Sequence, residues 1–180
     1  VGDFDNDGLS DVLIRKIANT GVQFMEADGT VNWVKNVSTD WGIEGVGDFD
    51  NDGKSDVLLR KTGDVGVQYL EADGTFTWIK NLSTDWSIDA IGDFDNDGLS
   101  DMLIRKASGA VQFMEANGSF NWVRNLSADW VVEAVGDYDG DNTADEILLR
   151  KAGGTGVQYM EADGTISWIA NLPANWVVQP

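Results

Sequence analysis

Residues 47–61 read GDFDNDGKSDVLLRK, an acidic, glycine-containing loop that runs directly into a short apolar segment. The string GDFDNDG, or its variant GDYDGDN, starts at four places in the chain: Gly2, Gly47, Gly92 and Gly136. The chain is therefore a tandem repeat with no linker left over, and its units are residues 1–45, 46–90, 91–134 and 135–180. A period of this length is typical both of helical solenoids and of β-propeller blades, so the content of each unit has to decide between them.

Each unit contains four short segments rich in valine, isoleucine and aromatic residues, bounded by Gly, Asp, Asn or Ser. In the second unit they are DVLLRK, GVQYLEA and TFTWIKN, followed by WSIDAIGD, which passes into the third unit. A dipeptide suited to a type I′ hairpin turn separates two of these segments in every unit: Asp28-Gly29, Asp73-Gly74, Asn117-Gly118 and Asp163-Gly164. No stretch carries the helical period for long enough to form a helix. We therefore expect an all-β fold, a β-propeller of four-stranded antiparallel blades with four repeats per chain.

The ends of the chain suggest how the blades close. Units one to three finish with a tryptophan-containing strand that leads into the next loop, whereas no such strand precedes Val1. Residues 176–180 supply an unattached strand, which we expect to close the ring on the N-terminal blade and remove an exposed edge. Residues 1–180 would then form one domain, either a four-bladed ring or half of an eight-bladed ring made by two chains. A fragment of a longer array is the third possibility, and the start at Val1, without a methionine or a signal peptide, indicates a mature or excised piece.

The acidic loop has the pattern Asp-x-Asp-x-Asp-Gly-x-x-Asp in the first three units, and four carboxylates this close repel one another unless a cation lies among them. An Asx-turn at a soluble surface is the alternative, but such a turn needs one Asp and not four. Hard oxygen donors in a flexible loop suit Ca²⁺, whereas Mg²⁺ gives up its waters reluctantly. The glycine allows a sharp turn, and the backbone carbonyl of the next residue would complete the ligand set. The candidate metal ligands are Asp3, Asp5, Asp7, Leu9, Asp11, Asp48, Asp50, Asp52, Lys54, Asp56, Asp93, Asp95, Asp97, Leu99, Asp101, Asp137, Asp139, Asp141, Thr143 and Asp145.

An EF-hand would need a bidentate Glu at the twelfth loop position and a helix after it. Inside segments with a strand pattern, that position holds Ile14, Leu59, Ile104 and Leu148. The loop before a strand instead resembles the FG-GAP or VCBS repeat, the calcium-loop blade of integrin α-subunit propellers and of many bacterial extracellular proteins. The resemblance covers all four units and implies that these aspartates hold the ion between strands at one rim of each blade. The fourth unit departs from the pattern with Gly140 and Asn142, but Asn tolerates a left-handed turn, so we expect this site to bind as well.

The pattern thus predicts about one Ca²⁺ per repeat, four per chain, with metal binding coupled to folding. Four ions would move the formal net charge from −19 to −11. An affinity on the order of 10⁻⁴–10⁻³ M is typical of extracellular modules and is useful only where calcium is plentiful. We therefore expect an extracellular or cell-surface protein.

Tryptophans recur in two sets of four. The set that opens the connecting strand is Trp41, Trp86, Trp130 and Trp176. Most tryptophans would pack between blades, but one set could line shallow pockets that stack against sugar rings, as in propeller lectins. The candidate ligand-binding residues are Trp33, Trp78, Trp122, Trp168, Gln23, Gln68, Gln112 and Gln158. Polar groups that orient such a ligand could also come from Glu26, Glu71, Glu115 and Glu161; the alternative for all these polar residues is a polar strand face or a hydrogen bond between blades.

Eight of the 12 basic residues form four Arg-Lys pairs, which begin at Arg15, Arg60, Arg105 and Arg150. An arginine on a strand beside acidic loops is expected to pair with a carboxylate. Binding of anionic sugars is the alternative.

Composition excludes several function classes. A net charge of −19, from 31 acidic and 12 basic residues, argues against nucleic acid and against an anionic membrane surface as partners. The chain has no His and no Cys, which excludes catalytic imidazoles, cysteine nucleophiles and disulfides. No apolar run approaches the roughly 20 residues that a membrane helix needs, so we expect no membrane insertion.

The function that fits these observations is a secreted calcium-binding β-propeller that acts as a binding or adhesion module, lectin-like, with repeated carbohydrate sites and avidity. Its partner would be a carbohydrate or an extracellular protein, and a homodimer could complete a larger ring. We expect no catalytic residues, because catalysis needs a unique residue set in one blade and the unique features here are slight. The alternatives are the propeller domain of a polysaccharide lyase or hydrolase, and a purely structural repeat of a surface protein or filament.

Overall fold

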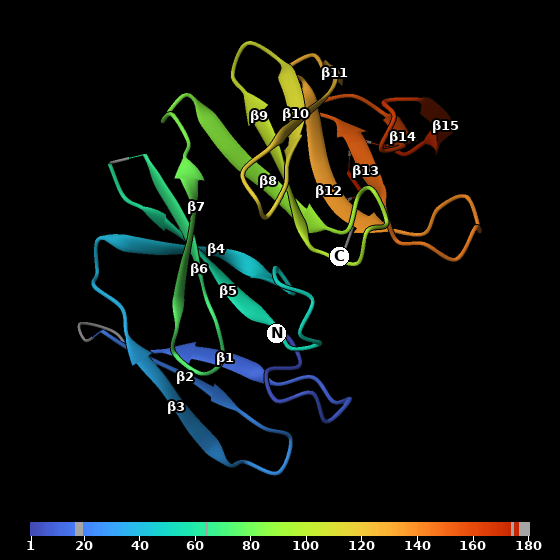
Figure 1. Cartoon of the computed structure of the whole chain (residues 1–180). Helices are drawn as coiled ribbons and strands as arrows, with labels where there is room; N and C mark the ends of the chain where they lie inside the picture. The colour runs from blue at the N-terminus through green and yellow to red at the C-terminus, as the bar shows by residue number, and fades with distance from the viewer. Residues whose placement is uncertain (17–19, 64, 174, 177–180) are drawn as a thin grey trace. The chain divides into compact units, whose positions relative to one another are not determined.

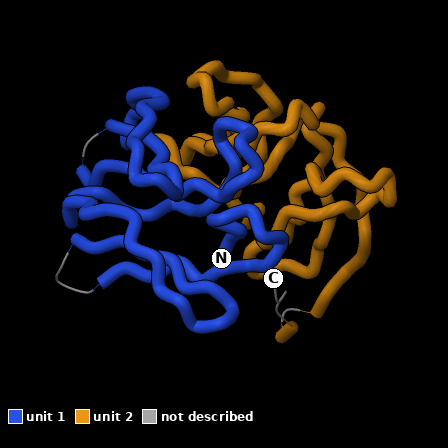
Figure 2. Tube along the Cα trace, turned by 60° about the horizontal axis from the view of Figure 1, so that its bottom comes forward, with its two compact units in different colours: residues 1–84 blue, residues 85–180 orange. Residues whose placement is uncertain are grey.

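The computed structural model of the chain describes residues 1–180 except 17–19, 64, 174 and 177–180. The described residues form fifteen β-strands and no helix, as the strand patterns predict (Figure 1). They fall into two compact units, residues 1–84 and 85–180 (Figure 2). The fold is all-β, and each unit is built from two antiparallel sheets.

The first unit contains a three-stranded sheet and a four-stranded sheet. The order β1-β2-β3 joins the strands β1 (Val12–Arg15), β2 (Gly21–Met25) and β3 (Val31–Asn36). The order β4-β5-β6-β7 joins the strands β4 (Trp41–Gly47), β5 (Asp56–Lys61), β6 (Gly66–Leu70) and β7 (Phe76–Asn81).

The second unit contains two four-stranded sheets. The first joins β8 (Trp86–Gly92), β9 (Asp101–Lys106), β10 (Ala110–Met114) and β11 (Phe120–Asn125) in chain order. The second joins β12 (Trp130–Gly136), β13 (Glu146–Lys151), β14 (Gly156–Met160) and β15 (Ile166–Asn171) in chain order. The first strands of these two sheets, β8 and β12, lie side by side (Figure 1).

Each complete sheet, or blade, takes its first strand from the end of one sequence repeat and its other three strands from the next repeat. In the first unit, β4 ends the first repeat and pairs with β5, so that Gly47 lies opposite Asp56. This pairing confirms that the tryptophan-containing strand leads into the next acidic loop. The first sheet has no fourth strand among the described residues. Of the predicted closing strand 176–180, only Trp176 is described, so ring closure and a single 180-residue domain stay predictions.

The hairpin turns differ from the predicted type I′. In the turn after β2, the Gly29 N–H donates to the Glu26 carbonyl at 3.0 Å, and Gly29 has a φ of 88° while Asp28 has no positive φ. A type I turn followed by a left-handed glycine fits the strand twist with this longer loop, and it leaves the Asp in an ordinary conformation. The recurring Asp or Asn serves instead as an acceptor, because Asp28 Oδ1 receives the Thr30 N–H at 2.7 Å and Asn117 Oδ1 receives the Ser119 N–H at 2.7 Å.

The core lies between and within the sheets of each unit. Phe4, Phe49 and Phe94, the aromatic residues of the acidic loops, are among the most deeply buried side chains. Phe94 stacks on Phe113 with ring centroids 4.5 Å apart, and Phe4 stacks on Phe24 at 5.4 Å. Burying one aromatic residue in each of the first three loops anchors the acidic segment to the blade, so the loop leaves the core in a fixed direction.

Candidate metal loops and the tryptophan edge

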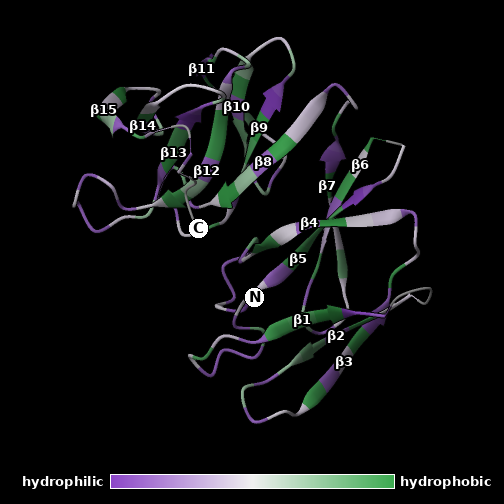
Figure 3. Cartoon of the chain, turned by 180° about the vertical axis from the view of Figure 1, so that it is seen from behind, coloured by the Kyte–Doolittle hydropathy of each residue, from purple (hydrophilic) through white to green (hydrophobic). Residues whose placement is uncertain are grey.

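The acidic loops are shaped by their own backbone amides. In the second loop, Asp48 Oδ2 accepts the Gly53 N–H at 3.0 Å, and Asp50 Oδ1 accepts the Asp52 N–H at 3.1 Å. The chain reverses through left-handed residues at Asn51, with a φ of 60°, and at Gly53, with a φ of 84°. Figure 3 shows the hydrophilic colouring of loops such as the one before β13. The aspartates are thus gathered by the fold itself.

The fourth loop reaches the same backbone shape with a different sequence. Its two left-handed residues are Gly140, with a φ of 86°, and Asn142, with a φ of 74°. The Asn142 N–H donates to Asp137 Oδ2 at 3.1 Å, the bond that a glycine makes in the other loops. The exchange of Asn and Gly between these two positions therefore leaves the turn intact, as the left-handed preference of Asn predicts.

The last aspartate of each of the first three loops is buried, although the preceding aspartates are more exposed. Asp11, Asp56 and Asp101 are each 1% exposed, and each begins or adjoins a strand at the base of the loop. Their Oδ2 atoms accept the N–H of the loop aromatic residue, at 2.9 Å from Phe4, 3.0 Å from Phe49 and 3.2 Å from Phe94. Burial raises the pKa of Asp56 and of Asp101 to about 7, against the N–H bond that lowers it.

Carboxylate oxygens of these buried aspartates meet those of the loop. One oxygen each from Asp93, Asp95 and Asp101 lie within 4.8 Å of one another. The same holds for the corresponding residues of the first and second loops, Asp3, Asp5 and Asp11, and Asp48, Asp50 and Asp56. The structure thus brings together the first, second and last predicted aspartates of these loops. The remaining predicted ligands, including the backbone carbonyls of Leu9, Lys54 and Leu99, stay predictions.

Asp101 has one buried carboxylate oxygen whose hydrogen-bonding capacity is unused. Its Oδ2 atom accepts the Phe94 N–H, but its Oδ1 atom is buried and has no hydrogen-bond partner. A buried carboxylate oxygen without a donor is costly. Asp93 and Asp95 each place one carboxylate oxygen within 4.8 Å of an oxygen of Asp101, and a cation with oxygen ligands would satisfy these groups. The residues present therefore fit a hard divalent cation such as Ca²⁺.

In the fourth loop the structure gathers Asp137, Asp139 and Asp141, whose oxygens also lie within 4.8 Å of one another. The predicted last ligand, Asp145, is not the first residue of the strand. Glu146 occupies that place, is 1% exposed, and accepts the Tyr138 N–H with Oε2 at 2.7 Å. The Asp-Gly-x-x-Asp spacing of the other loops selects Asp145 and not Glu146, because the fourth loop is one residue longer.

The glutamates that were candidates for orienting a sugar have other surroundings. Glu115 lies beside the third acidic loop, where one of its oxygens is within 4.8 Å of oxygens of Asp95 and Asp97. Burial, and then the charges of these two aspartates, raises the pKa of Glu115. Its side chain also accepts a hydrogen bond from Asn121, and Glu71 accepts one from Thr77 Oγ1 at 2.9 Å. These contacts place Glu115 at the candidate metal site rather than among the tryptophans.

The candidate tryptophans and glutamines do meet. In every sheet a glutamine of the next-to-last strand lies directly opposite a tryptophan of the outer strand, and the pairs are Gln23 with Trp33, Gln68 with Trp78, Gln112 with Trp122, and Gln158 with Trp168. The four tryptophans are between 54% and 58% exposed. This is unusual for so large an apolar side chain in four equivalent positions. Gln23, Gln68 and Gln112 are half-buried, whereas Gln158 is 6% exposed. The first three pairs thus offer an aromatic surface next to a partly exposed side-chain amide.

A glycine lies beneath these tryptophans. A Cβ atom on Gly66 would lie 2.8 Å from the Trp78 ring and 3.2 Å from the ring of Trp41, the tryptophan of the first strand. A Cβ atom on Gly156 would likewise lie 3.0 Å from Trp168 and 3.2 Å from Trp130. Two tryptophans of one blade therefore meet over a glycine, one of them half-buried and the other exposed. Trp33, Trp78, Trp122 and Trp168 form the exposed edge, and Trp41 and Trp130 support it in their blades.

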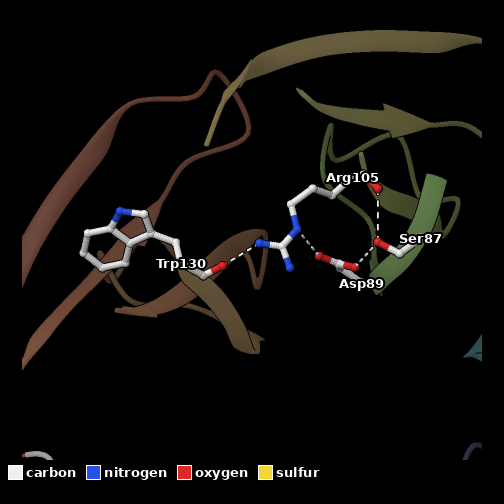
Figure 4. Close-up of polar contacts among 4 residues, drawn as sticks. All are labelled: Ser87, Asp89, Arg105 and Trp130. Carbon is white, nitrogen blue, oxygen red and sulfur yellow. Dashed lines mark hydrogen bonds and ion pairs between the residues drawn. The ribbon is translucent and has the colours of Figure 1, made fainter. Parts of the chain in front are cut away.

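The arginines of the Arg-Lys pairs fasten the loops that join the blades. Arg105 Nε lies 2.7 Å from Asp89 Oδ2, and Arg105 Nη1 donates to the Trp130 carbonyl at 2.5 Å (Figure 4). Arg15 instead donates to backbone carbonyls, with Nη1 2.6 Å from the Trp41 oxygen. The predicted pairing with a carboxylate is thus confirmed for Arg105, while in the first blade the carbonyls of the connecting segment take that role. These contacts hold the start of the tryptophan strand against the preceding blade.

Comparison with known proteins places these features in a family context. The profile of the FG-GAP-like repeat family matches residues 48–104, which contain the second acidic loop and the start of the third blade. No curated protein matches the sequence.

Solved structures with a similar fold include two lyases. A streptogramin B lyase matches with a TM-score of 0.56 at 13% identity over 92% of this chain and 52% of its own. The virginiamycin B lyase of Staphylococcus aureus matches with a TM-score of 0.57 at 14% identity over 92% and 53%. A Bacteroides caccae protein of unknown function matches with a TM-score of 0.52 at 10% identity over 89% and 57%. The chain thus spans about half the length of each structure, and the likeness concerns the fold, which is of the β-propeller type.

Proposed function

With the FG-GAP-like repeat at residues 48–104 as the premise, we propose that this protein is a secreted, calcium-binding β-propeller module that binds carbohydrate through repeated sites. FG-GAP-like repeats occur in extracellular proteins, and among the described residues no helix is long and apolar enough to cross a membrane. The family and the fold point to a binding or structural module. The finer statement, that the ligand is a carbohydrate, is supported by the tryptophan edge.

The observation that carries the proposal is the recurring pair of an exposed tryptophan and an opposing glutamine. Trp78 is 54% exposed, and Gln68 lies directly opposite it on the neighbouring strand. A sugar ring presents an apolar face, which stacks on an indole, and hydroxyl groups, which an amide can both donate to and accept from. Repetition of the same pair in every sheet suits several weak sites that act together. It does not suit catalysis, which needs a unique group in one blade.

Calcium has a structural role in this proposal. The acidic loops and the tryptophan–glutamine pairs involve different strand segments, since Asp56 opens β5 whereas Trp78 lies in β7. The ion would lock the loop at the start of each blade's second strand and so hold the sheet that presents the tryptophan. It would supply no contact to the sugar. Removing calcium should therefore weaken sugar binding only as far as it loosens the blades.

A glycan array with the full chain, repeated with Trp78→Ala and with Gln68→Ala, tests the carbohydrate proposal. We expect binding of wild type to a defined group of glycans, and weaker binding by both variants because one of the repeated sites is removed. A variant with the four edge tryptophans replaced together should lose binding. Absence of binding to any glycan by a correctly folded chain would contradict the proposal and favour a purely structural repeat.

Calcium binding is tested independently, by isothermal titration of the chelator-treated protein. We expect saturable binding with about one ion per repeat. A chain that retains its fold and takes up no calcium would contradict this half of the proposal while leaving the tryptophan edge untouched.

A further inference from the structure

The fourth acidic loop is one residue longer than the others, and the structure shows where the additional residue lies. Up to Thr143 the loop follows the third loop: the Thr143 N–H donates to Asp141 Oδ1 at 2.8 Å, as the Leu99 N–H donates to Asp97 Oδ1 at 2.8 Å. Beyond this point the third loop has one residue, Ser100, before its final aspartate. The fourth loop has two residues, so the insertion falls between Thr143 and strand β13.

At the strand the two loops come back into register, but on different residue types. Asp101 lies opposite Gly92 in the third blade, and Glu146 lies opposite Gly136 in the fourth. Both side chains are 1% exposed. Both accept the N–H of the loop aromatic residue, since Phe94 donates to Asp101 Oδ2 at 3.2 Å and Tyr138 donates to Glu146 Oε2 at 2.7 Å. Glu146 is therefore the structural equivalent of the final aspartate.

Asp145, which the sequence spacing selects, is held in another way. Thr143 Oγ1 lies 2.7 Å from Asp145 Oδ1 and 2.6 Å from Asp141 Oδ1, so the carboxylate is engaged by the loop's own hydroxyl. Its side chain is half-buried rather than buried. In the order of the chain it stands where Ser100 stands in the third loop, one residue before the strand.

We propose that Glu146, and not Asp145, is the carboxylate that closes the fourth metal site. This assignment rests on the proposed calcium binding and names a ligand within it. In the third loop, one oxygen of the final acid holds the loop amide, and the other, Asp101 Oδ1, is buried without a donor and available to an ion. Glu146 likewise places Oε2 on the Tyr138 amide, and its carboxyl group also has side-chain hydrogen bonds with Asp145 and Glu161. We assign Oε1 to the ion.

The longer arm of Glu146 compensates for the longer loop, but it carries one more rotatable bond than an Asp. The aromatic residue beside it, Tyr138, is 37% exposed, whereas Phe94 is buried. A ligand with more freedom, next to a less shielded loop, loses more entropy when it is fixed by the ion. The fourth site is therefore the weakest of the four, and it is the site from which calcium leaves first.

Calcium titration of the full chain with two isosteric variants tests the assignment, with Glu146→Gln as the test and Asp145→Asn as the control of equal charge. Changing residues that only support a metal ligand already costs about 10–100-fold in affinity, so loss of a ligand should cost at least this much. We expect Glu146→Gln to remove the weakest site from the isotherm and Asp145→Asn to change its affinity less than Glu146→Gln does. Loss of the site in Asp145→Asn alone, or equal losses in both variants, would overturn the assignment.

Two further measurements separate this assignment from folding and from the calcium proposal. Circular dichroism of both variants shows whether the sheets form. A crystal structure of wild type grown in calcium, which no mutation affects, should show the fourth ion bonded to Glu146 at roughly 2.3–2.6 Å. An ion bonded to Asp145 and away from Glu146 would overturn the assignment and leave calcium binding standing. A wild-type chain with no bound calcium would overturn both.

Discussion

The acidic loops and the tryptophan edge repeat equally often along the chain, yet the structure treats them in opposite ways. Each of the first three loops ends in a carboxylate that is 1% exposed, and at Asp101 one oxygen is buried without a donor. Each outer strand instead leaves a tryptophan more than half exposed. A polar group kept inside and an apolar group kept outside both run against the hydrophobic effect. In the proposed function, the first arrangement makes folding depend on an ion, and the second provides a surface for a ligand.

Removal of calcium should have the largest effect on stability, and this effect should arise at the acidic loops. At 10 mM calcium, a site with an affinity on the order of 10⁻⁴–10⁻³ M stabilises the fold by about 1.4–2.7 kcal/mol, so several sites together exceed the effect of one side chain. We expect chelation to lower the midpoint of thermal unfolding by at least about 10 °C. Calorimetry with calcium and with EDTA measures it, and an unchanged midpoint would contradict a structural role for the ion.

The pH dependence of folding stability should have opposite signs without and with calcium. Burial raises the pKa of Asp56 and Asp101 to about 7 in the metal-free fold, whereas in the unfolded chain these groups titrate near 3.8. Between these values the folded chain holds more protons, so the stability of the metal-free protein should fall as the pH rises from about 4 to 7. With calcium, the carboxylates must lose their protons to bind, so stability should rise over the same range.

Urea unfolding at pH 5 and pH 7.5 measures both slopes, with metal-free buffers and with calcium. Asp101→Asn is the control, because it removes one of the titrating groups and should flatten the metal-free slope. Parallel slopes with and without calcium would show that the buried aspartates do not meet the ion.

Substitution of an edge tryptophan should affect binding and hardly affect folding. Trp78→Ala removes a side chain that is 54% exposed, so we expect the free energy of unfolding to fall by no more than about 1–2 kcal/mol, less than the 3–5 kcal/mol typical of a buried tryptophan. Glycan affinity should fall at the same time. Phe94→Ala, in a fully buried position, is the matched contrast and should destabilise more. If the Trp78→Ala protein unfolds as readily as the Phe94→Ala protein, the edge tryptophans belong to the core and the prediction is wrong.

The smallest effect is expected beneath the tryptophans. In Gly66→Ala the new methyl group would meet the rings of Trp78 and Trp41, at 2.8 Å and 3.2 Å before any adjustment. The third blade already has Ala110 at the corresponding place, so the rings can give way and the loss of stability should stay below about 1 kcal/mol. Near-ultraviolet circular dichroism should detect the shift of the indoles. Ala110→Gly is the reciprocal variant and should change the same signal in the other direction.

The spacing of the sequence repeats and the strand patterns predict most of the fold, because short apolar segments between turn residues leave little choice of structure. They also predict that a final acid closes each loop. The repeat lengths locate a one-residue insertion near Glu146, but only strand pairing with Gly136 shows that Glu146 takes the register position of the final aspartate. The sequence patterns also fail at the hairpin turns, since an Asp-Gly pair fits two turn types and the hydrogen bond from Gly29 to Glu26 decides between them.

Which groups the arginines bind could not be fully predicted from the sequence, for a similar reason. Arg15 and Arg105 stand in the same repeat position, but Arg105 has Asp89 within reach on the neighbouring strand, whereas Arg15 belongs to a sheet with no described first strand. A carboxylate partner can be predicted only once the neighbouring strand is known. Backbone carbonyls, which every residue carries, leave no trace in the sequence.

The exchange of strands between repeats has a practical consequence for dissecting the chain. A cut at a boundary between sequence repeats, such as between residues 90 and 91, would fall inside β8. It would separate most of β8 from the loop that follows and leave β9 as an unpaired edge strand. A cut between residues 82 and 85 would fall after β7 and before β8, where no sheet is divided. Half-length pieces intended for expression, and circular permutants, should therefore begin or end between β7 and β8, and not at the boundary of the sequence repeat a few residues later.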